Sequence, residues 1–182
     1  VCAMTLIEQG KIRLQDRVSD YIPGYEGWTD EKGNKTAIRI IDLMTHTSGL
    51  PAYADANMLK EKYGAPNRDG LIDYIAHCKR IFKPGTDMTY SCLNFITLQR
   101  IIETVSGDDL RTYAHKHVFD VLGMKNTDYN PSKEMAKRCA PTEKQANGKC
   151  LLGYVHDPLA GIMNGGISGN AGVFTTADDV AI

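Results

Sequence analysis

Residues 93–105 (LNFITLQRIIETV) constrain the fold of this chain more than any other segment. Their apolar residues have helical spacing, and the Ser106-Gly107 pair that follows is a typical helix end. No other expected helix in the sequence is as apolar, so we predict that this one is central and buried. Helices over residues 69–79 and elsewhere would then pack around it.

Other segments carry the spacing or the end signals of shorter helices. We expect helices over residues 1–9 and 41–45, another from Asp108 to about residue 121, and a last one that begins after Thr176. Thr176 is a good N-cap residue, because its hydroxyl can accept a hydrogen bond from a free backbone N–H. Helices therefore predominate, and strands are expected to be sparse.

Turns and loops fill the remaining sequence. Residues 130–153 are turn-rich and locally basic, which predicts a solvated loop. The glycine-rich residues 165–172 predict either close backbone packing or a loop that lines a site. In His156-Asp157-Pro158 we expect the His-Asp pair to lock the loop by hydrogen bonds.

Composition and short motifs exclude several classes of function. The formal net charge is −1, with 21 basic and 22 acidic residues, which argues against a protein that holds nucleic acid by charge. No apolar stretch reaches the roughly 20 residues that cross a bilayer. Phosphate-loop and dinucleotide motifs are missing, and the five cysteines include no CxxC pair. His115 and His117 would point to different sides of a helix, so no metal site is expected there, and no organic cofactor is implied either.

Tyr90 is the candidate catalytic residue of this sequence. It lies just before the expected central helix, where the helix dipole favours the phenolate form. A tyrosine in this position can act as a general base or carry a proton, although most tyrosines are packing residues. The polar segment 46–51 (HTSGLP) suggests a turn, and Ser48 has no lysine three residues later to activate it as a nucleophile.

These motifs occur together and in one order, and in that order the chain resembles the serine β-lactamase-like and penicillin-binding-protein superfamily. The superfamily includes class C β-lactamases, D-alanyl-D-alanine peptidases and esterases. The matching segments are LIEQGKIRLQDRVSDYIPGY (6–25), LMTHTSGLP (43–51), KPGTDMTYSCLNFITLQRIIETVSG (83–107), LGMKNT (122–127), APTE (140–143), VHDPLA (155–160) and GGISGNAGVFTTADDVA (165–181). Together they cover nearly the whole chain.

The resemblance implies an α+β fold of the β-lactamase/transpeptidase type, with mostly the helical subdomain present and few strands of the antiparallel sheet. It gives Tyr90 the role of the tyrosine in the family's Tyr-x-Asn motif, which protonates the leaving group and activates the deacylating water. Cys92 stands where that motif has Asn or sometimes Asp, and a thiol cannot replace a carboxamide's donor and acceptor. Cys92 is expected to line the substrate pocket with Asn94 and with the loop residues Ser168, Gly169 and Asn170.

Two motifs of that family do not occur in the sequence. No serine is followed three residues later by lysine, and neither Lys-Thr-Gly nor His-x-Gly is present. The resemblance places the nucleophilic serine just before Val1 and the third motif after Ile182. We therefore expect residues 1–182 to be one partial domain, truncated at both ends and inactive by itself.

The function implied by the resemblance is that of a serine hydrolase which forms an acyl-enzyme from an ester or an amide. Its substrate would be a small molecule or a peptidoglycan peptide, and the family's habit implies export to the periplasm or cell envelope. Two alternatives remain open. The first is a non-catalytic peptidoglycan- or peptide-binding module of the same fold, which is consistent with Cys92. The second is a structural or regulatory domain attached to another enzyme.

Overall fold

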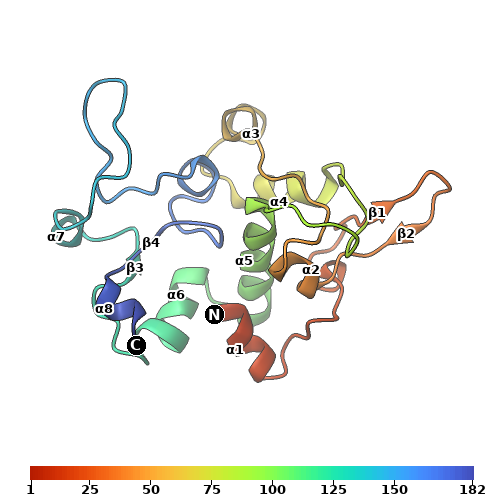
Figure 1. Ribbon diagram of the computed structural model, residues 1–182, viewed down its shortest axis with the longest axis horizontal. Helices are drawn as coiled ribbons and strands as arrows, with labels where there is room; N and C mark the ends of the chain where they lie inside the picture. The colour runs from red at the N-terminus through yellow and green to blue at the C-terminus, as the bar shows by residue number, and fades with distance from the viewer.

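The computed structural model describes residues 1–182 and places helix α5 (Cys92–Ser106) at the centre (Figure 1). The side chains of Leu93, Ile96 and Ile101 are buried along it. Ser91 caps its start by accepting a hydrogen bond from the Leu93 N–H at 3.2 Å, and Gly107 ends it in the left-handed conformation. The predicted central helix is confirmed.

Four helices pack directly against α5. They are α1 (Cys2–Glu8), α2 (Ile40–Met44), α4 (Arg68–His77) and α6 (Leu110–Ala114). All four fall within or overlap segments that the sequence predicted to be helical. Arg80 satisfies the end of α4, because its guanidinium donates to the carbonyl oxygens of Ile75 and Ala76 at 3.0 and 2.9 Å.

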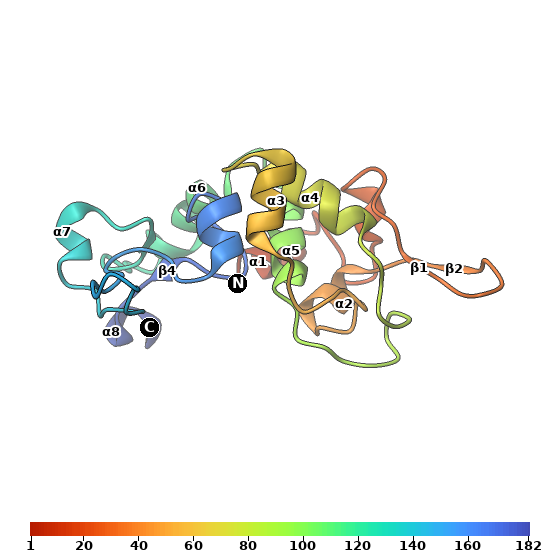
Figure 2. The same cartoon turned by 90° about the horizontal axis from the view of Figure 1, so that it is seen from above.

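Helix α3 (Ala56–Tyr63) was not predicted. It begins at Asp55, whose carboxylate accepts hydrogen bonds from the N–H groups of Asn57 and Met58 at 2.9 and 3.1 Å. Only Ala56 and Leu59 of this helix are buried, so few apolar residues mark it in the sequence. The helix lies between α4 and the π-helical turn η3 (Leu159–Met163), which is the blue turn beside it in Figure 2.

Two short antiparallel sheets lie away from α5, in agreement with the prediction of few strands. Strands β1 (Trp28–Thr29) and β2 (Lys35–Thr36) form a hairpin that projects from one end of the molecule (Figure 1). Strands β3 (Asp128–Tyr129) and β4 (Val173–Phe174) pair Tyr129 with Val173. The second sheet therefore anchors the glycine-rich loop 165–172 to a distant part of the chain.

The remaining helical turns are short. They are the 3-10 helix η1 (Val18–Asp20), the π-helical turn η2 (His115–Phe119), α7 (Lys133–Ala136) and α8 (Ala177–Val180). The helix expected up to about residue 121 is therefore α6 continued by a wider turn, and α7 interrupts the predicted loop 130–153. Thr176 caps α8, since its hydroxyl accepts from the Asp179 N–H at 3.3 Å, as predicted.

Candidate active site

Two segments far apart in the sequence run side by side to form the floor of the candidate site. Residues 46–52 contain the HTSGLP motif, and residues 81–92 lead into α5. Four backbone hydrogen bonds join them: Ile81 N–H to Gly49 O at 2.7 Å, Gly85 N–H to Thr47 O at 2.9 Å, Thr89 N–H to His46 O at 3.1 Å and Cys92 N–H to Ala52 O at 2.8 Å. The first turn of α5 is thereby fixed against the HTSGLP segment.

Gly49 is required for this pairing. Its φ is +77°, in the left-handed region, and a Cβ at this position would lie 2.2 Å from the Phe82 carbonyl oxygen. Real Cβ atoms do not approach an oxygen so closely. The glycine of the HTSGLP motif therefore serves the contact between the two segments as well as the turn.

Tyr90 lies at the exposed end of this arrangement, two residues before α5 begins. Its side chain is 62% exposed, and its ring packs on the His46 imidazole with centroids 4.6 Å apart and planes 39° apart. The imidazole also packs on Phe95, at 5.3 Å between centroids. A solvent-facing phenol therefore stands near the positive end of the central helix, against a fixed imidazole.

Behind His46 lies a chain of buried polar side chains. The Asn94 amide nitrogen donates to His46 Nδ1 at 3.0 Å, and its oxygen accepts from the Ser48 hydroxyl at 2.6 Å. That hydroxyl in turn accepts from the Leu50 N–H at 3.1 Å. Asn94 and Ser48 are both buried, and their polar atoms are used inside the protein.

Cys92 begins α5 beside Asn170 of the glycine-rich loop. Burial raises the pKa of the Cys92 thiol, the Asn170 amide lowers it in part, and the negative charge of Asp157 raises it further. The thiol is therefore neutral at pH 7 and is not an activated nucleophile. The Asn170 amide nitrogen is buried and makes no hydrogen bond of ordinary geometry, and the Cys92 sulfur lies close enough for this amide to stabilise its thiolate.

Gln99 of α5 holds the glycine-rich loop in place. Its side-chain oxygen accepts from the Gly169 N–H at 3.0 Å and from the Asn164 amide at 3.3 Å, and its nitrogen donates to the Ile167 carbonyl at 3.2 Å. A Cβ at Gly169 would lie 2.0 Å from a backbone oxygen of α5, that of Phe95. The loop therefore touches the helix backbone directly.

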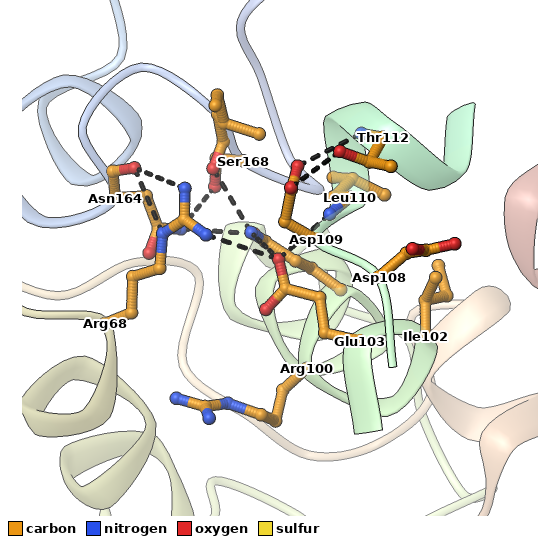
Figure 3. A network of polar contacts seen from close by, with 12 residues as sticks. Arg68, Arg100, Ile102, Glu103, Asp108, Asp109, Leu110, Thr112, Asn164 and Ser168 are labelled. Atoms are coloured by element: carbon orange, nitrogen blue, oxygen red, sulfur yellow. Dashed lines mark hydrogen bonds and ion pairs between the residues drawn. The ribbon is translucent and has the colours of Figure 1, made fainter. Parts of the chain in front are cut away.

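Further contacts extend this network on both sides of Gln99. Figure 3 shows Arg68 reaching the Glu103 carboxylate at 3.4 Å and the Asn164 carbonyl oxygen, with Ser168 beside Asn164. The Asn164 amide donates to the Ser168 hydroxyl at 2.6 Å, and that hydroxyl donates to Asn170 Oδ1 at 2.6 Å. The network thus ends at Asn170 and fixes the orientation of its amide.

A cavity of about 840 Å³ borders the end of the glycine-rich loop, at Ala171 and Gly172. Tyr154, His156, Asp157 and Ala171 are among the residues that line it. Asp157 accepts a hydrogen bond from the Ala160 N–H at 2.8 Å and so fixes the start of η3. His156 does not pair with Asp157, because its Nε2 lies 3.5 Å from the Glu143 carboxylate. The prediction of a His156–Asp157 pair is therefore wrong.

The family model for Beta-lactamase matches residues 1–182, the full length described here. The chain belongs to the beta-lactamase family. No helix of this family member is long and apolar enough to span a membrane. The structure contains no group of three or more His, Cys, Asp or Glu side chains placed to hold a metal ion.

Two curated relatives of this beta-lactamase-family chain are named as enzymes that act on cell-wall components. It is 34% identical over 197 residues to "N-acetylmuramyl-L-alanine amidase" of Bacillus subtilis (strain 168), covering 97% of this chain and 44% of the relative. It is 30% identical over 195 residues to "Putative D-alanyl-D-alanine carboxypeptidase" of Salmonella heidelberg (strain SL476), covering 97% and 45%. The chain therefore spans a little under half the length of these relatives.

Solved structures share the fold of this beta-lactamase-family chain. One is "EstCE1, a hydrolase with promiscuous acyltransferase activity", with a TM-score of 0.74 and 23% identity over 98% of this chain and 53% of that one. At this identity the match shows the fold alone. The predicted β-lactamase/transpeptidase-like fold class is thus confirmed, with mostly helices and two small antiparallel sheets.

The structure brings the predicted site residues of this beta-lactamase-family chain to one end of α5. Tyr90 and Cys92 lie at its start, and Asn170 reaches the same end from the glycine-rich loop. Asn94 and Ser168 are buried and hydrogen-bonded inside the protein, and Gly169, which is half-buried, packs on the α5 backbone. His46 was not predicted as a neighbour of Tyr90, although the dense polar HTSGLP motif was a signal for it.

Proposed function

We propose that this chain carries part of the active site of a serine hydrolase that forms an acyl-enzyme from an ester or an amide. The observation that carries the proposal is the exposed phenol of Tyr90 at the start of the buried helix α5, packed on His46. In the proposed reaction a serine outside residues 1–182 attacks the acyl carbon and gives its proton to the lysine of the same Ser-x-x-Lys motif, which returns it to the serine on deacylation. Without that serine, residues 1–182 have no turnover of their own.

Tyr90 is the proposed proton-transfer residue. Its ring faces solvent, so substrate can reach the hydroxyl, and its position at the helix start favours a developing phenolate. In acylation the phenol donates its proton to the leaving group, and in deacylation the phenolate accepts a proton from the attacking water. One group serves both steps because each step restores the protonation state that the other needs.

Cys92 and Asn170 are the proposed substrate-binding residues. Cys92 offers a substrate only a weak donor and a weak acceptor, and the buried Asn170 amide beside it orients the thiol. The names of the two curated relatives favour a peptidoglycan peptide as substrate, and with it a location in the periplasm or cell envelope.

The test uses the full-length protein encoded by the reading frame that contains residues 1–182. We expect turnover of a p-nitrophenyl acyl ester and covalent labelling by a fluorescent penicillin. Tyr90→Phe should lower kcat by about 10²- to 10⁴-fold, the usual contribution of a general acid–base group. Tyr63→Phe is the matched control, because it removes a phenol that contacts Asp73 on the surface. A protein with neither turnover nor labelling would refute the enzyme proposal.

The second candidate is a non-catalytic peptidoglycan- or peptide-binding module, and Cys92 is the observation that favours it. A module of this kind would bind a D-alanyl-D-alanine peptide with a measurable Kd and would show no turnover. The change Cys92→Asn separates the two candidates, because it restores the amide at this position. It should raise the turnover of amide substrates in an enzyme, whereas in a binding module it would change the Kd alone.

A further inference from the structure

We propose that His46 is a positioning residue for Tyr90, and that it acts as a neutral imidazole with a fixed tautomer. This inference rests on the proposed function, because it concerns the orientation of the proton-transfer residue. Three features of the structure carry it: the hydrogen bonds to Nδ1, the left-handed backbone at position 46 and the packing of three rings.

The hydrogen bonds assign the tautomer. The backbone N–H of Ser91 donates to His46 Nδ1 at 3.2 Å, and a backbone N–H can only donate. Nδ1 therefore carries a lone pair, and the proton of the neutral ring lies on Nε2. The Asn94 amide donates to the same nitrogen at 3.0 Å, since its oxygen already accepts from Ser48.

The same two donors keep the ring uncharged. A proton on Nδ1 would point at the N–H groups of Ser91 and Asn94 and would replace two attractive contacts with repulsive ones. Burial also lowers the pKa of His46. The ring that packs on Tyr90 is thus a neutral aromatic surface that orients the phenol and adds no charge beside it.

The backbone at position 46 is adapted to this task. The φ of His46 is +59°, a conformation that few residues other than glycine adopt, and His, Asn and Asp adopt it more often than the rest. In this conformation the His46 carbonyl accepts from the Thr89 N–H at 3.1 Å while the ring reaches Ser91. The backbone and the side chain of one residue therefore hold both neighbours of Tyr90.

The ring contact fixes the remaining freedom of the phenol. Tyr90 is exposed and makes no side-chain hydrogen bond, so its packing on the imidazole at 4.6 Å between centroids is what limits its rotation. Phe95 packs on the same imidazole, with the ring centroids 5.3 Å apart, and restricts its movement. Loss of the ring would leave the phenol free to leave the orientation that proton transfer requires.

The experiment compares His46→Gly with His46→Asn in the full-length protein, using p-nitrophenyl ester turnover. Both replacements tolerate the left-handed backbone, and Asn alone can still accept the hydrogen bond from the Ser91 N–H. We expect His46→Gly to lower kcat about 100-fold with a change in KM of less than about threefold, and His46→Asn to recover part of the loss. His77→Asn, on the exposed end of α4, is the control and should behave as wild type.

The double variant with Tyr90→Phe separates positioning from a general structural effect. If His46 acts through Tyr90, adding His46→Gly to Tyr90→Phe should lower kcat by less than about threefold more. A further 100-fold loss in the double variant would overturn the proposal, as would an unchanged kcat in the single variant. In either case the ester turnover of the wild type would leave the proposed function standing. A wild-type protein without turnover would overturn both.

Discussion

Gly49 offers the sharpest test of how the candidate site is built. The change Gly49→Ala introduces a Cβ that would lie 2.2 Å from the Phe82 carbonyl oxygen, at a residue whose φ is +77°. Because backbone lines the contact on both sides, the two segments can relieve it only by moving apart. That movement would strain the Ile81 N–H bond to Gly49 O and displace the chain that leads to Tyr90.

The expected loss of stability has two parts. An alanine in the left-handed region costs about 1–2 kcal/mol, and overpacking of a tight contact adds about 1–3 kcal/mol. Gly85→Ala measures the first part alone, because Gly85 has a φ of +79° and nothing within 4 Å of the added Cβ. We therefore expect Gly49→Ala to lower the free energy of unfolding by about 1–3 kcal/mol more than Gly85→Ala does.

The assay is urea unfolding at 25 °C, followed by circular dichroism, on the wild type and both variants. Ester turnover measured on the same samples should fall in Gly49→Ala, because the segment that carries Tyr90 has moved, and should stay near wild type in Gly85→Ala. Equal stability losses in the two variants would show that the 2.2 Å contact relaxes at no cost. That result would refute the claim that Gly49 fixes the pairing of the two segments.

Two further predictions concern charge and buried polarity. Hydrogen bonds to Asp120 and Asp128 raise the pKa of His115 above 6.5. The charged imidazole therefore stabilises the folded state fully below about pH 6.5, and this stabilisation is lost as the pH rises through the raised pKa. His115→Gln should therefore destabilise most at acid pH in urea titrations, and a pH-independent loss would contradict this. Gln99→Leu should lower the free energy of unfolding by about 2–5 kcal/mol in the same assay, because it leaves the Gly169 N–H and other buried groups unpaired. An unchanged unfolding midpoint would contradict this prediction.

The sequence predicts the helical frame because the signals for it are local. Apolar spacing in α5, the Gly107 stop and the Thr176 cap each involve neighbouring residues, and the structure confirms all three. Helix α3 escaped prediction, since its start depends on the Asp55 cap and it buries few side chains. The α5 spacing, the Gly107 stop and the Thr176 cap could be predicted because each depends only on residues nearby in the sequence.

The candidate site was predictable in part. Tyr90 stands out because it precedes a recognisable helix, and the family resemblance adds Cys92 and Asn170. The position of His46 could not be read from its own surroundings, because its partners lie 45 and 48 positions further along the chain. Asn94 lies only two residues after Cys92, yet its position on α5 turns its side chain inward. There it bonds to His46, a contact that only the tertiary structure creates.

The pairing of residues 46–52 with residues 81–92 also bears on the order in which the molecule forms. Bringing His46 to Ser91 closes a loop of 45 positions, and the conformational entropy of that closure is lost before any contact at the site compensates for it. Helix α5 can begin to form from local interactions alone. Tyr90 therefore acquires its neighbours only when the two segments meet, and a folding intermediate with its helices in place would still lack the site.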